Sequence, residues 1–133
     1  MVTIKEDYVS FETAKLLKEK GFDARCPMIY TADGEMLYTD VKHHNMYAVT
    51  NKQLEYYTDI IAPSQAIAIK WLREVHKIFI EISVSIDLNG EHHYSYSILN
   101  RECKYVRKGY TDFDWNYEQA CETAIKYCLE NLI

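Results

Sequence analysis

The chain has 133 residues, of which 48% are hydrophobic and 26% charged, a balance typical of a folded domain rather than a disordered segment. Its formal net charge of −5 argues against general nucleic-acid binding, which needs a positive field to displace counterions from phosphates. We expect one compact domain over residues 1–133. Twelve tyrosines are more than a small core can use, so several should lie at the surface.

The cysteines and the hydropathy pattern predict a cytoplasmic protein with reduced thiols. Among the four cysteines no pair has CxxC spacing, and Cys121 and Cys128 fall in one predicted helix. Their Cα atoms would be roughly 10.5 Å apart, too far for a disulfide. We therefore expect mostly buried, reduced thiols. No apolar run approaches the roughly 18 residues of a membrane span, and the start lacks a signal-peptide core.

The first predicted element is a helix in VSFETAKLLKEKGF. Ser10 is a good N-cap. Gly21 can adopt the left-handed conformation after the helix, which lets Phe22 fold back on Leu17. The following PMIYTADGEMLY predicts a hairpin with a DG turn, in which Met28 and Tyr30 face Tyr38 and Met36.

Residues 39–61 form a long irregular segment in this interpretation. It could hold a short strand at Met46 to Val49 and a helical turn after Asn51. Long loops in small domains tend to be functional or disordered.

APSQAIAIKWLREVH predicts a second helix that begins after Pro63, with Ser64 as a cap. At 100° per residue its apolar stripe places Trp71 in the core rather than at a contact site. The stripe comprises Ala68, Trp71, Leu72 and Val75, flanked by Ile67 and Ile69.

FIEISVSIDLNGEHHYSYSIL predicts a second hairpin with two possible registers. A two-residue Asn89-Gly90 turn would set Ile86 opposite His93. A type I turn with Gly90 in a bulge would set Ile86 opposite His92 and would match apolar with apolar residues as far as Ile80 and Ile98. Because a one-residue slip turns every side chain to the other face, the pattern favours the bulge.

The chain ends with a short strand near Lys104 to Val106 and a helix from about Tyr117 to Leu132, in which Asn116 and Gln119 have the spacing of a capping box. The order α-ββ-α-ββ(β)-α predicts an α+β fold, with an antiparallel sheet built from two hairpins and three helices on one face.

The sequence offers little for catalysis or metal binding. Adjacent histidines, as in His43-His44 and His92-His93, point to opposite faces of a strand and cannot easily supply two ligands to one ion. No glycine-rich phosphate loop and no nucleophile motif is present. We therefore expect no catalytic residues, metal or cofactor, and no enzymatic activity.

Two residue sets remain as candidate binding groups. Candidate anion contacts are Arg73, Lys104, Arg107 and Lys108, although the last three could instead be a charged edge strand that discourages aggregation. Candidate protein contacts are Tyr47, Tyr56 and Tyr57, because tyrosine is favoured at interfaces. Tyr94 and Tyr96 could join that surface, or lie beneath the helices as the bulge register requires.

Three segments, VSFETAKLLKEKGFD, APSQAIAIKWLREVH and NYEQACETAIKYCLENLI, resemble small uncharacterised proteins of gut-bacterial phages, prophages and mobile elements. The resemblance covers about half of the chain and implies an intracellular origin in a phage or mobile element, with no activity or site residues attached to it.

Three hypotheses follow. The first is a non-enzymatic module that binds a host or phage protein, such as an inhibitor of a host or defence protein, since an acidic surface can cover a basic one. The second is a small-ligand or anion-binding protein with a pocket between sheet and helices, where Arg73, Arg107 and the histidines converge. The third is a homo-oligomeric structural protein, for instance a homodimer paired through an edge strand.

Overall fold

The computed structural model describes residues 2–43 and 46–133. Where a single domain over 1–133 was expected, the contacts group into two compact units, Met1–Ser64 and Gln65–Ile133, and we describe each by itself. Both combine helices with antiparallel strands, which confirms the α+β class. The two predicted hairpins lie in two separate three-stranded sheets, which corrects the expectation of one shared sheet.

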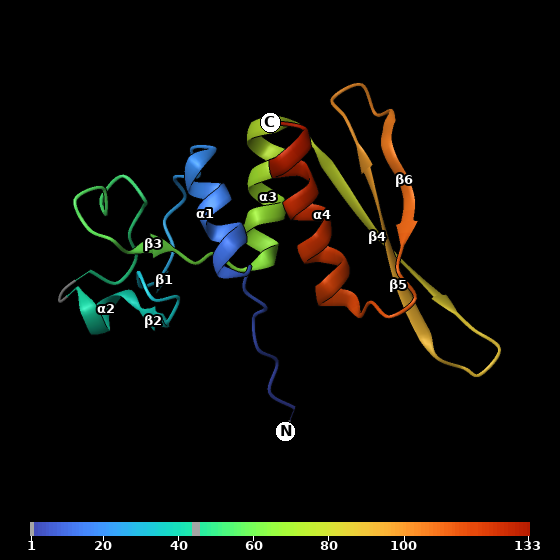
Figure 1. The fold of residues 1–133 in the computed structure, drawn as a ribbon, viewed down its shortest axis with the longest axis horizontal. Helices are drawn as coiled ribbons and strands as arrows, with labels where there is room; N and C mark the ends of the chain where they lie inside the picture. Colours follow the sequence, from blue (N-terminus) through green and yellow to red (C-terminus); the bar gives the residue numbers. More distant parts are fainter. Residues whose placement is uncertain (1, 44–45) are drawn as a thin grey trace. The chain divides into compact units, whose positions relative to one another are not determined.

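The first unit carries one full helix and one small sheet of strand order β2-β1-β3 (Figure 1). Its elements are α1 (Phe11–Glu19), β1 (Met28–Tyr30), β2 (Met36–Tyr38), α2 (Thr39–Lys42) and β3 (Ile60–Ile61).

Both predicted ends of α1 are confirmed. The Ser10 hydroxyl accepts a hydrogen bond from the backbone N–H of Thr13 at 3.2 Å. Gly21 takes φ +87°, its N–H bonds to the Lys18 carbonyl, and the Phe22 N–H bonds to the Leu17 carbonyl at 2.9 Å. These two bonds satisfy carbonyls that the helix end would leave unpaired.

The first hairpin has the predicted register, with Met28 opposite Tyr38 and Tyr30 opposite Met36. β3 pairs with the other edge of β1, so that Ile29 lies opposite Ile61 at the buried centre of this sheet. The strand that closes the sheet therefore comes from the segment that the sequence analysis described as irregular.

Residues 39–61 contain α2, a series of turns and β3 in their described part. The strand expected at Met46 to Val49 is reduced to a single bridge between Val49 and Cys26. The helical turn expected after Asn51 is present as a bond from the Leu54 N–H to the Asn51 carbonyl. The Asn51 amide also donates to the Phe22 carbonyl and accepts from the Ile61 N–H, which ties the middle of the segment to its end and to the residues after α1.

Asp59 is the buried charged residue of this segment. Lys42 Nζ lies 2.7 Å from Asp59 Oδ1, and His43 Nε2 lies 2.8 Å from Asp59 Oδ2. Burial alone would raise the pKa of the Asp59 carboxyl, but its hydrogen bonds and charge interactions with Lys42 and His43 outweigh burial and lower that pKa below 3.8. The carboxylate thus joins the end of α2 to the residue directly before β3, 17 positions later in the chain.

We predict that Asp59→Ala lowers the free energy of unfolding by about 1–3 kcal/mol at pH 7, because it leaves His43 and Lys42 without their acceptor. Urea unfolding followed by far-UV circular dichroism measures the change. The control is Glu55→Ala, which removes an exposed carboxylate from the same segment and should cost less than about 0.5 kcal/mol. Equal effects of the two substitutions would contradict a structural role for the buried carboxylate.

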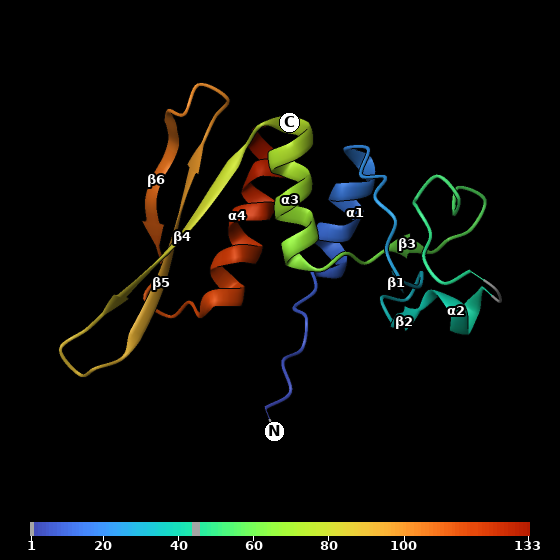
Figure 2. The same cartoon turned by 180° about the vertical axis from the view of Figure 1, so that it is seen from behind.

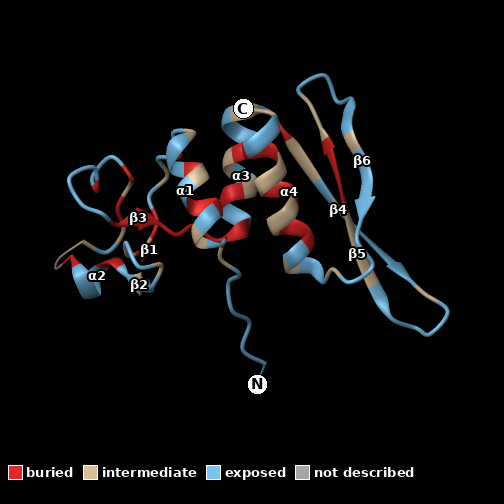
Figure 3. Ribbon diagram, viewed as in Figure 1, coloured by how far each residue is buried: buried red, intermediate tan, exposed pale blue. Residues whose placement is uncertain are grey.

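The second unit is a sheet of order β4-β5-β6 with two helices packed side by side on one of its faces (Figures 1 and 2). Its elements are α3 (Gln65–His76), β4 (Phe79–Ile86), β5 (His92–Leu99), β6 (Tyr105–Thr111) and α4 (Tyr117–Asn131). Buried residues come from α3, α4 and the middle of β5, whereas the end of the β4–β5 hairpin is exposed (Figure 3).

The apolar stripe predicted for α3 is confirmed in part. Ala68 and Leu72 are fully buried, but Val75 is exposed. Trp71 is half-buried, and its ring packs edge-on against His76 with centroids 4.6 Å apart. The tryptophan therefore packs against its own helix but is not fully buried, so its predicted place in the core is confirmed only in part.

The β4–β5 hairpin adopts the bulge register. Ile86 lies opposite His92 and Ile80 opposite Ile98. Gly90 takes φ +81° and donates its N–H to the Asp87 carbonyl at 3.1 Å. Tyr96 consequently lies beneath the helices and is buried, as this register required.

The last two elements were predicted with unequal success. β6 runs from Tyr105 to Thr111, longer than the short strand expected near Lys104 to Val106. The capping box of α4 is present, with Asn116 and Gln119 exchanging side-chain and backbone bonds at 2.8 Å. None of the helices in the described part of the chain is long and apolar enough to cross a membrane.

Candidate functional site

Two irregularities in β6 decide which of its side chains face the helices. Tyr96 pairs with Tyr110 and Ile98 with Arg107, so one residue of β5 lies opposite two residues of β6 between these pairs. Gly109, one of the two, takes φ +61° and donates its N–H to the Ser97 hydroxyl at 2.7 Å. This bulge places Arg107 and Tyr110 on the same face, although a regular strand would point them to opposite faces.

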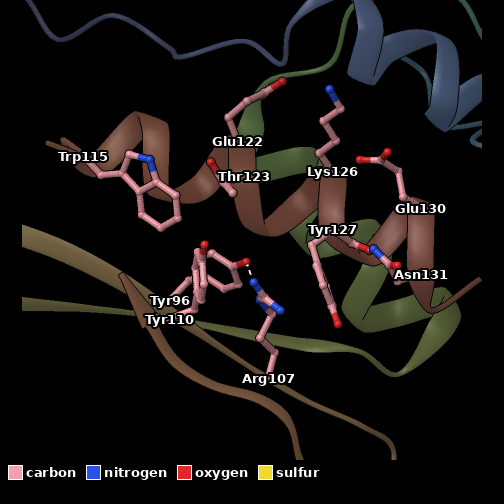
Figure 4. Close-up of a pocket in the computed structure, with 10 residues that line it drawn as sticks. All are labelled: Tyr96, Arg107, Tyr110, Trp115, Glu122, Thr123, Lys126, Tyr127, Glu130 and Asn131. Atoms are coloured by element: carbon pink, nitrogen blue, oxygen red, sulfur yellow. Dashed lines mark hydrogen bonds between the residues drawn. The ribbon is translucent and has the colours of Figure 1, made fainter. Parts of the chain in front are cut away.

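Arg107 is held by aromatic rings on this face. Its Nε donates to the Tyr96 hydroxyl at 2.8 Å. Its guanidinium carbon lies 4.0 Å from the centroid of the Tyr110 ring and 4.4 Å from that of Tyr127 in α4. Figure 4 shows the guanidinium between these rings, with the Tyr96 hydrogen bond drawn as a dashed line. Such cation–π contacts contribute about 0.5–2 kcal/mol each.

Trp115, in the connection before α4, extends the aromatic cluster. Its ring stacks on Tyr96 with centroids 5.7 Å apart and an interplanar angle of 24°. It also contacts Tyr110 at 5.6 Å. The flat surface beside Arg107 is therefore built from β5, β6 and the segment between β6 and α4.

These side chains line a cavity of about 270 Å³ between the sheet and α4. The α4 side of the cavity is polar and carries both charge signs (Figure 4). The residues lining it are Tyr96, Arg107, Tyr110, Trp115, Glu122, Thr123, Lys126, Tyr127, Glu130 and Asn131. Apolar and aromatic walls with a few convergent polar groups are the usual composition of a small-molecule site.

Two cationic side chains, Arg107 and Lys126, and two carboxylates, Glu122 and Glu130, line the cavity. Among the residues that the structure describes, Arg107 forms no ion pair with a carboxylate. Burial raises the pKa of the Tyr96 hydroxyl, and this effect outweighs the opposite influence of Arg107. Tyr96 is thus uncharged near pH 7 and does not neutralise the guanidinium.

The structure separates the four predicted anion contacts. Only Arg107 lines the cavity. Arg73 lies on α3 beside Glu74, with Nε 3.5 Å from the carboxylate. Lys104 is exposed in the turn before β6, and Lys108 is exposed with Nζ 5.3 Å from the centroid of the Tyr105 ring. The expected convergence of Arg73 and the histidines on Arg107 is therefore absent from this cavity.

The three predicted contact tyrosines lie in the first unit and are exposed. Tyr56 is 91% exposed and Tyr47 also faces solvent. Tyr57 is exposed as well, and its ring makes an edge-on contact with the His43 ring, with centroids 4.7 Å apart. These side chains are available for contact with another molecule.

A second cluster of polar groups lies at the tip of the β4–β5 hairpin. Asp87, Glu91 and His93 bring potential ligand atoms within 4.8 Å of one another. However, His93 Nε2 lies 2.7 Å from Asp87 Oδ2, and His93 Nδ1 lies 2.7 Å from the Phe113 carbonyl. Both ring nitrogens are thus engaged, Nε2 within the hairpin and Nδ1 with the segment after β6. His44 of the other adjacent pair lies outside the described residues.

The cysteines are free thiols, and Cys26, Cys121 and Cys128 are buried while Cys103 is exposed. Burial raises the pKa of Cys26 to about 11 and that of Cys128 to about 12. These two thiols stay protonated near pH 7 and are poor nucleophiles.

No protein family model matches this chain, and no match was found among curated proteins or solved structures. The resemblance to phage and mobile-element proteins therefore stays a prediction.

We predict a raised pKa for His93, above the ordinary value of 6.5, because the Asp87 carboxylate and the Phe113 carbonyl both stabilise the charged ring. The pKa of Asp87 is lowered below 3.8, chiefly by the His93 hydrogen bond. The contribution of His93 to stability is complete below pH 6.5 and is lost as the pH rises through its folded-state pKa. The contribution of Asp87 is present above pH 3.8 and is lost as the pH falls through its folded-state value.

An NMR titration of the His93 ring protons measures this pKa directly. Asp87→Asn should return it toward 6.5, since it removes the negative charge and keeps the shape of the side chain. A value at or below 6.5 in the unsubstituted protein would contradict the bridging geometry.

Proposed function

We propose that the protein binds a small organic anion in the cavity between β6 and α4, with the carboxylate or phosphate of the ligand on Arg107. The observation that carries this proposal is a guanidinium held between two tyrosine rings without a carboxylate partner among the described residues. The fixed guanidinium offers N–H donors in a planar array that suits carboxylate and phosphate oxygens.

The aromatic walls define the rest of the ligand. A flat or apolar body can lie against Trp115 and Tyr110, while its anionic group reaches Arg107. A cavity of about 270 Å³ is slightly below the usual range for drug-sized ligands, which limits the ligand to a small molecule. The proposal is one of binding without catalysis, in keeping with the expectation from the sequence.

We predict that phenyl phosphate and benzoate bind the protein and that benzamide, the neutral counterpart of benzoate, does not. Inorganic phosphate should bind more weakly than phenyl phosphate, because it lacks the ring that contacts the aromatic wall. A Trp71→Phe background leaves Trp115 as the remaining tryptophan, so its fluorescence reports on occupancy of the cavity.

Arg107→Gln should weaken binding of phenyl phosphate by about tenfold or more, as expected for the loss of a charge-assisted hydrogen bond. The matched control is Lys108→Gln, which removes the same charge from the next residue of β6 outside the cavity and should leave affinity within about twofold. Equal affinities for benzoate and benzamide, or an unchanged affinity in Arg107→Gln, would refute the proposal.

A second candidate function is protein binding through Tyr47, Tyr56 and Tyr57 of the first unit. It is favoured by the exposure of Tyr56, 91% of whose surface is open to solvent. Exposed tyrosines contribute large contact areas at low entropic cost. In this proposal the partner is a host or phage protein and the chain acts as an inhibitor or adaptor.

We predict that a tagged protein captures one host protein in stoichiometric amounts and that the Tyr56→Ala/Tyr57→Ala double variant loses it. Leu88→Ala provides the control, since it removes an exposed apolar side chain from the second unit. Mass spectrometry of material captured from host-cell lysate identifies the partner. Retention of that partner by the double variant would exclude these tyrosines as the contact.

A further inference from the structure

The two edges of the β4-β5-β6 sheet differ in a way that points to self-association. β6 carries two register shifts against β5, and its residues include Gly109, Arg107 and Lys108. Bulges and cationic residues are the common means by which proteins prevent a sheet edge from pairing. This edge is therefore protected.

β4 has none of these protections. Its eight residues, FIEISVSI, pair with β5 in one uninterrupted register and contain no proline, glycine or basic residue. The edge of β4 that faces away from β5 has no neighbouring strand among the described residues. A long, regular and exposed edge is a template for another strand.

The hydrogen bonds of the turn show which backbone groups of β4 point to the free edge. The Asp87 N–H bonds to the Glu91 carbonyl at 2.9 Å, so these two residues form a hydrogen-bonded pair. Such pairs alternate along an antiparallel ladder. The next residue, Ile86, and every second residue before it therefore direct N–H and C=O away from β5. These residues are Ile80, Ile82, Val84 and Ile86.

The same residues carry the apolar face of the strand. Val84 is 58% exposed and Ile86 is 64% exposed, because the hairpin extends past the helices (Figures 1 and 3). The free edge thus combines unpaired backbone groups with two apolar side chains, Val84 and Ile86, that are more than half exposed.

We propose that β4 pairs with β4 of a second copy of this chain, antiparallel about a two-fold axis through Ser83, to form one continuous six-stranded sheet. This register sets Ile82 against the partner's Val84 and Ile80 against the partner's Ile86, so exposed apolar residues meet half-buried ones. It forms roughly eight backbone hydrogen bonds, two for each hydrogen-bonded pair.

Charge on the other face disfavours two alternative registers. Glu81 is the only charged residue of β4. With the axis at Ser83, Glu81 faces the partner's Ser85. With the axis at Glu81, the Glu81 carboxylates of the two copies would face each other. With the axis at Val84, each Glu81 would face the partner's Asp87. Both arrangements place like charges opposite each other and are repulsive. A second copy fits this edge because the strand is complementary to itself.

The proposal is independent of the anion site, which involves β6 and α4 on the opposite side of β5. Sedimentation equilibrium over a range of concentrations tests it in the purified protein. The expected result is a monomer–dimer equilibrium between 15.7 kDa and twice that mass. If the protein stays a monomer at every concentration, the proposal is overturned, even if β4 accepts a strand from another protein.

Val84→Lys should weaken dimerisation by at least about tenfold, because the pairing would bury an ammonium group against the partner's Ile82. Val84→Thr, which keeps a β-branched side chain, should dimerise within about threefold of the unsubstituted protein. Far-UV circular dichroism of both variants checks that they fold. A dimer that persists unchanged in Val84→Lys would assign the contact to another surface.

A cross-link tests the register without disturbing the apolar face. Ser83→Cys is made in a Cys103→Ser background. When diamide is added as the oxidant, the two introduced thiols of a dimer should form an intermolecular disulfide, since non-hydrogen-bonded pairs bring Cα atoms to about 4.5 Å. Ser85→Cys in the same background should not, because its counterpart would lie four residues away along the partner strand. The remaining cysteines are buried. Equal cross-linking of the two variants, or none in Ser83→Cys, would overturn the proposed register.

Discussion

The second unit depends on one backbone conformation, the left-handed Gly90 in the turn between β4 and β5. A bulge there fixes the pairing of Ile86 with His92, and every later pair follows from it. A slip by one residue would send Tyr96 and Ile98 to solvent and leave α4 without a surface to pack on. Only glycine adopts φ +81° without steric cost. Gly90 therefore determines to which face each of the sixteen side chains of β4 and β5 points.

The same device appears in β6 with a different result. Gly109 inserts an extra residue, and the bulge turns Arg107 toward the tyrosine rings that the β4–β5 register has placed beneath α4. The bulge also interrupts the edge of the sheet. One local irregularity thus builds the cavity and protects β6 from pairing, while β4 remains regular and open.

The features that sequence predicted well are those set by neighbouring residues. The cap at Ser10, the glycine end of α1 and the capping box at Asn116 each depend on a few adjacent positions. The hairpin registers followed from alternation on both strands. In β6 the bulges break alternation, so YVRKGYT showed no period of two and the strand was placed too short.

Long-range relations were beyond such reasoning. The sequence identified Arg107 as a candidate anion contact. Its ring partners could not be predicted, because Tyr96 lies 11 positions away in β5 and Tyr127 lies 20 positions away in α4. The division into two units and the place of β3 in the first sheet depend on which apolar surfaces pack together. A short apolar segment can pack against several others, so the sequence alone does not specify its neighbour. Asp59 gave no signal in the sequence, because a buried carboxylate looks the same as an exposed one.

The proposed anion site would have to act within an acidic protein. The net charge of −5 acts over the whole surface and is screened within about 8 Å at physiological ionic strength. Inside the cavity the Arg107 guanidinium contacts the Tyr110 and Tyr127 rings, and these contacts offset part of its lost hydration. Glu122 and Glu130 on the opposite wall oppose a strongly charged ligand. The site should therefore discriminate by the position of one anionic group on a flat body rather than by total charge.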